Sequence, residues 1–399
     1  MTCIEKEQAA SSPSAGVLRW VERLIAFDTT SRNTNLALIE EVKAHFDRHG
    51  LPVTMTMNRE RTKANLFATI PDSQGSERGG MILSGHTDVV PVDGQDWTSD
   101  PFRATIREGR LYGRGACDMK GFLGVSLAAL PWAVGLRLRQ PLHFALSFDE
   151  EVGCLGAPLL IQDIVERGIR PSGCLVGEPT EMMPVVAHKA MRMFRCQVHG
   201  QASHSSRTPA GVNAIEYAAR IICAIRQMAD QSRLEGPFQA EFDVPFTTAS
   251  VGTIRGGIAP NTVPADCEFL FEYRSLPGED PSRLERRIRA FIDDVVLPEM
   301  RAENEAANVA VEALANVPPL APCIDDAFTR LVRNLARPGS QKVAYGTEAG
   351  QFQKADIPAI ICGPGSIEQA HKADEYVELS QLALCEHFIA ELVRSSALP

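Results

Sequence analysis

The chain has 399 residues, 44% of them hydrophobic and 23% charged, which is a normal composition for a water-soluble globular protein. This length exceeds one ordinary hydrophobic core, so we expect two or three packed units. The 40 lysines and arginines against 50 acidic residues give a net charge of -10. The charge leaves no basic surface for nucleic acid and suits a small cationic or zwitterionic substrate.

Export and membrane insertion are not expected. Glu5, Lys6 and Glu7 occupy the place where an export signal needs apolar residues. The longest apolar run, 121–136, contains Pro131 and is shorter than the roughly 20 residues that cross a bilayer. The 10 cysteines occur singly, without a C-x-x-C pair, which favours reduced thiols in a cytoplasmic protein.

Helical and extended patterns alternate over much of the chain. Two helical patterns lie between residues 16 and 50, and Gly50 ends the second. Continuous apolar runs, typical of strands buried on both faces, occupy 81–86, 142–148, 173–178 and 357–363. Further helices are predicted at 121–134 and 156–167. This alternation predicts an α/β fold with a sheet flanked by helices.

The pattern changes between residues 189 and 311. Strand, helix, two strands, helix and strand are predicted, in that order, at 191–200, 211–231, 248–257, 266–275, 280–297 and 308–314. This β-α-β-β-α-β order is typical of a ferredoxin-like unit. We therefore predict a main domain of residues 1–188 and 312–399, an inserted domain of residues 189–311, and hinges near 189 and 312.

Potential metal ligands follow the ends of the apolar strands. His86 ends one strand, Glu178 ends another, and the acids 149–151 follow a third. The carboxyl ends of strands form the ligand-binding crevice of an open α/β sheet, so these side chains are expected to meet there. Asp88 lies two residues beyond His86 on an extended segment, where its carboxylate can hold the far imidazole nitrogen.

Taken singly, each of these residues also has a purely structural interpretation. His86 could be a core histidine, the acids 149–151 an exposed turn, and His371 and His204 plain loop residues. Asp118 in the glycine-rich turn 113–121 could cap the helix that follows. A dinucleotide fingerprint is disfavoured there, because Asp118 stands where a third glycine is needed.

A helical pair, His45 and His49, resembles the histidine pair of zinc proteases. Phe46 stands where that motif needs a glutamate, so we interpret the pair as part of a surface helix.

Seven sequence blocks together resemble one enzyme family. They occur in order between residues 18 and 392: GHTDVVPVDGQDW, YGRGACDMKG, DEEVG, GEPT, GQASHSS, NTVPADCEFLFEYR and GPGSIEQAHKADEY. These blocks are similar to those of the peptidase family M20 metallohydrolases. The resemblance implies a zinc-aminopeptidase-like catalytic domain with a mixed sheet, and an inserted ferredoxin-like lid that forms a homodimer.

The resemblance also implies the roles of the site residues. Asp118 would bridge two zinc ions, for which cobalt is a possible substitute; the other implied ligands are His86 and Glu178 at one zinc, and Glu151 and His371 at the other. Asp88 would orient His86, and Glu150 would be the general base for a metal-bridging hydroxide. His204, Asn261, Arg274, Glu348, Gly365 and Ser366 would contribute to catalysis or substrate binding.

Within the family, the blocks are most similar to the acetylornithine deacetylases. The implied reaction is hydrolysis of the amide bond of N2-acetyl-L-ornithine to L-ornithine and acetate, a step of arginine biosynthesis. A succinyl-diaminopimelate desuccinylase, an aminoacylase or a dipeptidase would keep the same metal ligands and remains the alternative. A non-catalytic binding module is disfavoured because every ligand position and the base are filled.

Overall fold

The computed structural model describes residues 12–398, and these divide into two compact units. The first comprises the described residues up to Ala187 together with Leu320–Lys342 and from Thr347 onward, and the second comprises His188–Pro319 and Val343–Gly346. The predicted boundary after residue 311 falls inside strand β14 (Asn308–Val317). That strand pairs with β9 (Ala190–His199) along nearly its full length, which keeps it in the second unit.

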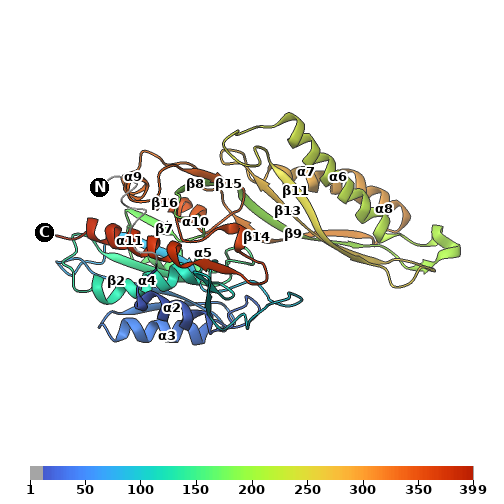
Figure 1. The fold of residues 1–399 in the computed structure, drawn as a ribbon. Coiled ribbons are helices and arrows are strands. Elements are labelled where there is room, and N and C mark those ends of the chain that lie inside the picture. The colour runs from blue at the N-terminus through green and yellow to red at the C-terminus, as the bar shows by residue number, and fades with distance from the viewer. Residues whose placement is uncertain (1–11, 399) are drawn as a thin grey trace. The chain divides into compact units, whose positions relative to one another are not determined.

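An eight-stranded mixed sheet forms the centre of the first unit (Figure 1). Its parallel core, in spatial order, is β6 (Leu142–Ser147), β3 (Met81–His86), β7 (Gly173–Val176) and β16 (Ala359–Ile361). All four match the predicted apolar runs, and every residue in them is buried. The remaining strands are β1 (Val53–Met57), β2 (Ala64–Ile70), β8 (Val185–His188) and β15 (Gln341–Val343).

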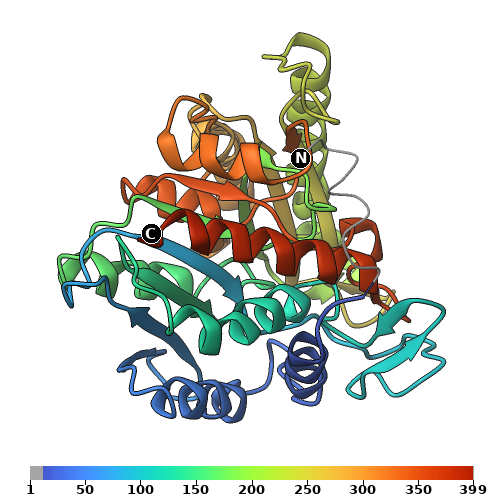
Figure 2. The ribbon, with the colours of Figure 1, turned by 60° about the vertical axis from the view of Figure 1, so that its left-hand side comes forward.

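Helices cover this sheet (Figure 2). The one that begins closest to the predicted site is α4 (Lys120–Ala133), which packs against β3. The others are α2 (Ala15–Ile25), α3 (Leu36–Asp47), α5 (Ala157–Glu166), α9 (Ala327–Leu335), α10 (Ala349–Lys354) and α11 (Leu379–Ser395), with the short η3 (Ile367–Gln369). A separate small sheet has the order β17 (Tyr376–Glu378), β5 (Arg110–Tyr112) and β4 (Thr105–Arg107).

Close packing of α4 on the sheet depends on small residues. A methyl group on Gly85 would lie 2.7 Å from the side chain of Met119 and 2.9 Å from that of Leu123. A methyl group on Gly177 would lie 2.0 Å from the ring of Phe122. The two glycines next to His86 and Glu178 therefore let α4 approach the strand ends that carry these side chains.

The second unit contains a four-stranded antiparallel sheet of order β11-β13-β9-β14. This is the strand order of a ferredoxin-like unit, and the long helix α6 (Ala214–Glu235) packs on it. The remaining elements are β10 (Ser203–His204), η1 (Ser205–Ala210), β11 (Thr248–Gly256), β12 (Thr262–Val263), β13 (Asp266–Ser275), α7 (Arg283–Phe291), η2 (Ile292–Val296) and α8 (Leu297–Glu303). The two short strands β10 and β12 pair with each other and were not predicted.

The interpretation of the His45 pair as surface residues is wrong for His45. This side chain is only 6% exposed, and its Nε2 lies 3.0 Å from the carbonyl oxygen of Leu127 in α4. The face of α3 that carries Val42 and Phe46 turns into the core and takes His45 with it. Burial lowers the pKa of His45 to about 4, so the imidazole is neutral near pH 7.

Two expectations from composition can be compared with the described residues. No helix within residues 12–398 is long and apolar enough to span a membrane. The nine cysteines from Cys117 onward are all unpaired thiols, and seven of these nine are buried. Cys3 lies outside the described residues.

Candidate metal centre

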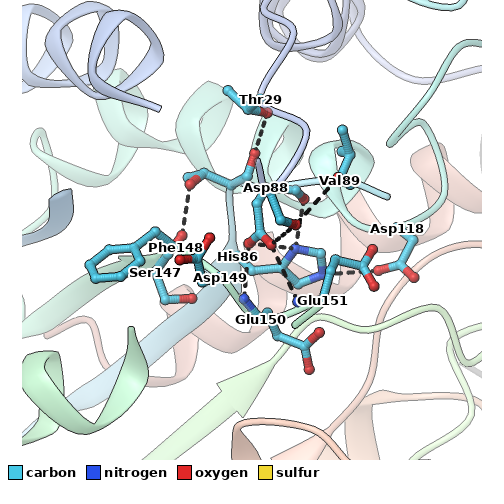
Figure 3. Close-up of polar contacts among 12 residues, drawn as sticks. Thr29, His86, Asp88, Val89, Asp118, Ser147, Phe148, Asp149, Glu150 and Glu151 are labelled. Carbon is cyan, nitrogen blue, oxygen red and sulfur yellow. Dashed lines mark hydrogen bonds and ion pairs between the residues drawn. The ribbon is translucent and has the colours of Figure 1, made fainter. Parts of the chain in front are cut away.

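The carboxylate of Asp118 lies between two imidazole rings. Its Oδ1 is 2.9 Å from Nε2 of His86, and its Oδ2 is 3.3 Å from Nε2 of His371. Figure 3 shows the first of these contacts. One carboxylate that offers a separate oxygen to each of two histidines is the arrangement needed to bridge two cations.

The other two predicted ligands complete the two sides of this arrangement. Glu178 Oε1 lies 3.9 Å from Nε2 of His86, and Glu151 Oε2 lies 3.1 Å from Nε2 of His371. The structure thus gathers the five predicted ligands into one site, with His86 and Glu178 on one side of Asp118 and Glu151 and His371 on the other. His86, Glu151 and Glu178 converge because β3, β6 and β7 are parallel and their carboxyl ends lie at one edge of the sheet. Asp118 and His371 come from the turn before α4 and the loop after η3.

Asp88 holds His86 in a different way from the one predicted. Nδ1 of His86 lies 2.9 Å from the backbone carbonyl oxygen of Asp88, while the nearer carboxylate oxygen is 3.6 Å away. The Asp88 carboxylate instead accepts hydrogen bonds from the backbone N–H groups of Glu150 (3.1 Å) and Glu151 (3.3 Å) and from the hydroxyl of Ser31 (2.7 Å). The Asp88 carbonyl oxygen therefore orients the imidazole with Nε2 toward the site, and the Asp88 carboxylate holds the backbone of residues 150 and 151.

Glu150 is half-buried beside the ligands. Its carboxylate, with His86 and Glu178, offers ligand atoms that all lie within 4.8 Å of one another. The thiol of Cys154 donates a hydrogen bond to Glu150 Oε1 at 3.2 Å. This contact was not predicted, because Cys154 carries no motif beyond its position four residues after Glu150.

The electrostatics of the site show an excess of buried negative charge. Burial raises the pKa of Glu150 to about 8 and that of Glu151 to about 7, and repulsion from neighbouring carboxylates adds to both shifts. Burial also raises the pKa of Glu178, with further repulsion from Asp118. Hydrogen bonds to Asp118 and Glu151 raise the pKa of His371 to about 10. A bound cation would remove the repulsion among the acids.

The donor set fits divalent metal ions. Each side offers one imidazole nitrogen and carboxylate oxygens, which are ligand types that zinc accepts. Oε1 of Glu151 is buried and has no hydrogen-bond partner among residues 12–398. A buried carboxylate oxygen without a partner is costly, and metal coordination would remove that cost.

Three predicted substrate contacts lie in the same unit as the metal ligands. Glu348 is 1% exposed at the start of α10, and its charge is close enough to raise the pKa of Glu150. Gly365 and Ser366 follow β16; the carbonyl oxygen of Ser366 accepts a hydrogen bond from the Cys117 thiol at 3.2 Å. Gly365 has a φ of 86°, and a methyl group there would lie 2.6 Å from the same sulfur.

The other three predicted contacts belong to the second unit. His204 is exposed and pairs with Thr262, and the carbonyl oxygen of Asn261 accepts a hydrogen bond from the Ser205 N–H at 3.0 Å. His204 and Asn261 therefore lie close together. Arg274 lies on β13, where its guanidinium forms an ion pair with Glu272 at 3.0 Å.

The chain belongs to peptidase family M20/M25/M40, whose pattern matches residues 82–395. It is a metallohydrolase of this family with an α/β catalytic fold. It is 34% identical, over 374 residues, to the acetylornithine deacetylase of Myxococcus xanthus, covering 93% of this chain and 94% of that one. It is also 34% identical to the acetylornithine deacetylase of Proteus mirabilis (strain HI4320), covering 94% and 93%.

A solved structure shows the same fold. The M20 family metallo-carboxypeptidase Sso-CP2 from Sulfolobus solfataricus superposes with a TM-score of 0.75 at 16% sequence identity. The match covers 96% of this chain and 99% of that one.

Proposed function

We propose that this protein hydrolyses the amide bond of N2-acetyl-L-ornithine, releasing L-ornithine and acetate. The observation that carries the proposal is the 34% identity to acetylornithine deacetylases over 93% of the chain. The metal centre around Asp118 supports the amide-hydrolase chemistry, and the net charge of -10 suits a substrate with a cationic side chain. The buried Glu348 carboxylate is a candidate partner for that cationic group.

The proposed cofactor is a pair of zinc ions, for which cobalt can substitute. His86 and Glu178 would hold one ion, Glu151 and His371 the other, and Asp118 both. When bound, the pair would polarise the scissile carbonyl and lower the pKa of a nearby water.

Glu150 is the proposed proton carrier. Its carboxylate takes a proton from the attacking water as the oxygen adds to the acetyl carbon, and returns it to the amine as the C–N bond breaks. Asp88 holds the Glu150 backbone, and the Cys154 thiol holds its side chain. His204 is a candidate donor to the oxygen of the tetrahedral intermediate, and Asn261 and Arg274 are candidate contacts to the substrate.

A panel of substrates tests the proposal. Purified enzyme loaded with zinc should give its highest kcat/KM with N2-acetyl-L-ornithine when compared with succinyl-diaminopimelate, other N-acetyl amino acids and dipeptides. Preference for a succinyl group or a dipeptide would assign the chain to another branch of the family.

The second unit is the proposed homodimer interface. Strand β11 is at the edge of its sheet, and Ile254 on it is 51% exposed. An unpaired strand edge with exposed apolar side chains is suited to pairing with a second copy. Sedimentation should show a dimer for the native chain and a shift toward monomer for Ile254→Lys; a native monomer would contradict this assignment.

A further inference from the structure

A buried ion pair lies directly behind the Asp118 turn. Arg114 Nη1 donates a hydrogen bond to Glu375 Oε2 at 2.7 Å, and each side chain is only 1% exposed. Neither residue is one of the five proposed metal ligands. Both residues lie within the family blocks YGRGACDMKG and GPGSIEQAHKADEY, but the resemblance implies no role for either.

The Glu375 carboxylate organises the backbone of the turn that presents Asp118. Its Oε1 accepts the N–H groups of Cys117 (2.9 Å) and Asp118 (3.0 Å), and its Oε2 accepts that of Gly115 (3.1 Å). Three backbone donors and one guanidinium thus converge on one carboxylate. Charge-assisted hydrogen bonds of this kind are stronger than neutral ones, so the turn is held firmly.

The same pair also holds the loop that presents His371. Arg114 Nη1 donates to the carbonyl oxygen of Lys372 at 3.2 Å, and the Gly113 N–H donates to that of Glu375 at 3.0 Å. The Arg114 guanidinium also donates to the side chain of Gln95. The Gln95 amide in turn donates to the carbonyl oxygen of His371 at 2.9 Å.

His371 needs such support more than the other ligands do. It lies outside any strand, its side chain is 53% exposed, and its φ of 65° is in the left-handed region. Non-glycine residues adopt that conformation only where their surroundings compensate for the strain. His86, by contrast, ends a buried strand.

We infer that Glu375 and Arg114 are positioning residues that set Asp118 against His371 and so determine metal affinity on the His371 side of the centre. This inference rests on the proposed two-metal site. It extends that site to two residues outside the proposed ligands and the proposed substrate contacts. Such supporting residues change metal affinity by about 10–100-fold in other sites.

The test is zinc titration of the metal-free protein against a competing chelator. Glu375→Ala should bind one of the two zincs, the same one that His371→Ala loses, about 10–100-fold less tightly. Glu375→Gln should recover much of that loss, because its amide oxygen can still accept from the Cys117 and Asp118 N–H groups. Glu378→Ala is the matched control. Glu378 lies three residues after Glu375 and forms a surface ion pair with Arg110 at 3.6 Å. Its loss should leave the affinities for both zincs unchanged.

The outcomes separate this inference from the proposed function. If the native chain binds zinc twice and folded Glu375→Ala does so with native affinities, the positioning role is wrong while the metal centre stands. If the native chain binds no zinc, the metal centre itself is wrong. Should Glu375→Ala not fold, Arg114→Met combined with Glu375→Met removes both the pair and the acceptor of the turn N–H groups without leaving an unpaired buried charge, and native zinc affinities in that folded variant would overturn the inference.

Discussion

Oδ2 of Asp118 lies 3.3 Å from Nε2 of His371, although the two residues are 253 positions apart in the chain. The other oxygen of Asp118 faces His86 at 2.9 Å. Because one carboxylate serves both sides, loss of Asp118 and loss of His371 should have different consequences.

Asp118→Ala is expected to abolish tight binding of both metals, and His371→Ala to release only one. The bound metal should therefore fall from about two per chain to near zero in the first variant and to about one in the second. Atomic spectroscopy after gel filtration measures this. Equal metal content in the two variants would show that Asp118 does not bridge.

Glu150→Gln is expected to separate catalysis from metal binding. The amide cannot accept the proton, so kcat should fall by about 10²–10⁴-fold while both metals stay bound. Glu166→Gln, an exposed acid at the end of α5, is the control and should keep native kcat. Native turnover in Glu150→Gln would reject the assignment of the base.

His143 is expected to make stability depend on pH below neutrality. It is fully buried on β6, between the Thr69 hydroxyl (2.9 Å) and the Gly79 carbonyl oxygen (2.8 Å). Burial lowers its pKa from 6.5 to about 4, so the unfolded chain binds a proton that the folded chain does not between these pH values. The free energy of unfolding contributed by this group therefore falls as pH decreases from about 6.5 toward 4, by at most about 3 kcal/mol.

Thermal denaturation of the native chain and of His143→Gln between pH 7 and pH 5 measures this contribution. The variant should be less stable at pH 7 and should show a shallower loss of stability as pH falls. Parallel curves would show that His143 is not responsible.

Gly177→Ala is expected to damage both packing and the metal centre. The added methyl group would overlap the Phe122 ring at 2.0 Å, and overpacking of this kind costs about 1–3 kcal/mol. Its neighbour Glu178 should shift with it, so metal affinity should fall as well. Gly16→Ala is the control, because its methyl group meets nothing closer than 3.5 Å. Equal stability in the two variants, measured by chemical denaturation, would contradict the packing argument.

Much of the fold could be predicted from local sequence. The four central strands read as continuous apolar runs because both faces of each are covered. The second unit is predicted by its order of elements. Its end is predicted too early, inside the strand that begins at Asn308, because only the pairing of β14 with β9, which continues to Val317, shows that the whole strand belongs to the second unit.

The ligands could be proposed because a histidine or acid at the end of a buried strand is unusual, and because the family blocks surround them. That signal is local, and it indicated His86, Glu178 and the acids 149–151 without knowledge of the sheet order; the choice of Glu151 as the ligand rests on the resemblance. The substrate contacts rest on the resemblance alone, since loop residues such as Ser366 carry no periodic pattern.

Tertiary structure alone decided which atoms hold the ligands. The sequence places Asp88 beside His86, but only the fold brings the backbone of residues 150–151 to the Asp88 carboxylate. The His86 imidazole contacts the backbone carbonyl oxygen of Asp88 instead. The sequence likewise contained Glu375, but its contact with the Asp118 turn joins segments 257 residues apart. Hydrogen bonds between such distant segments depend on where the chain returns in space, and no local pattern of residues encodes that.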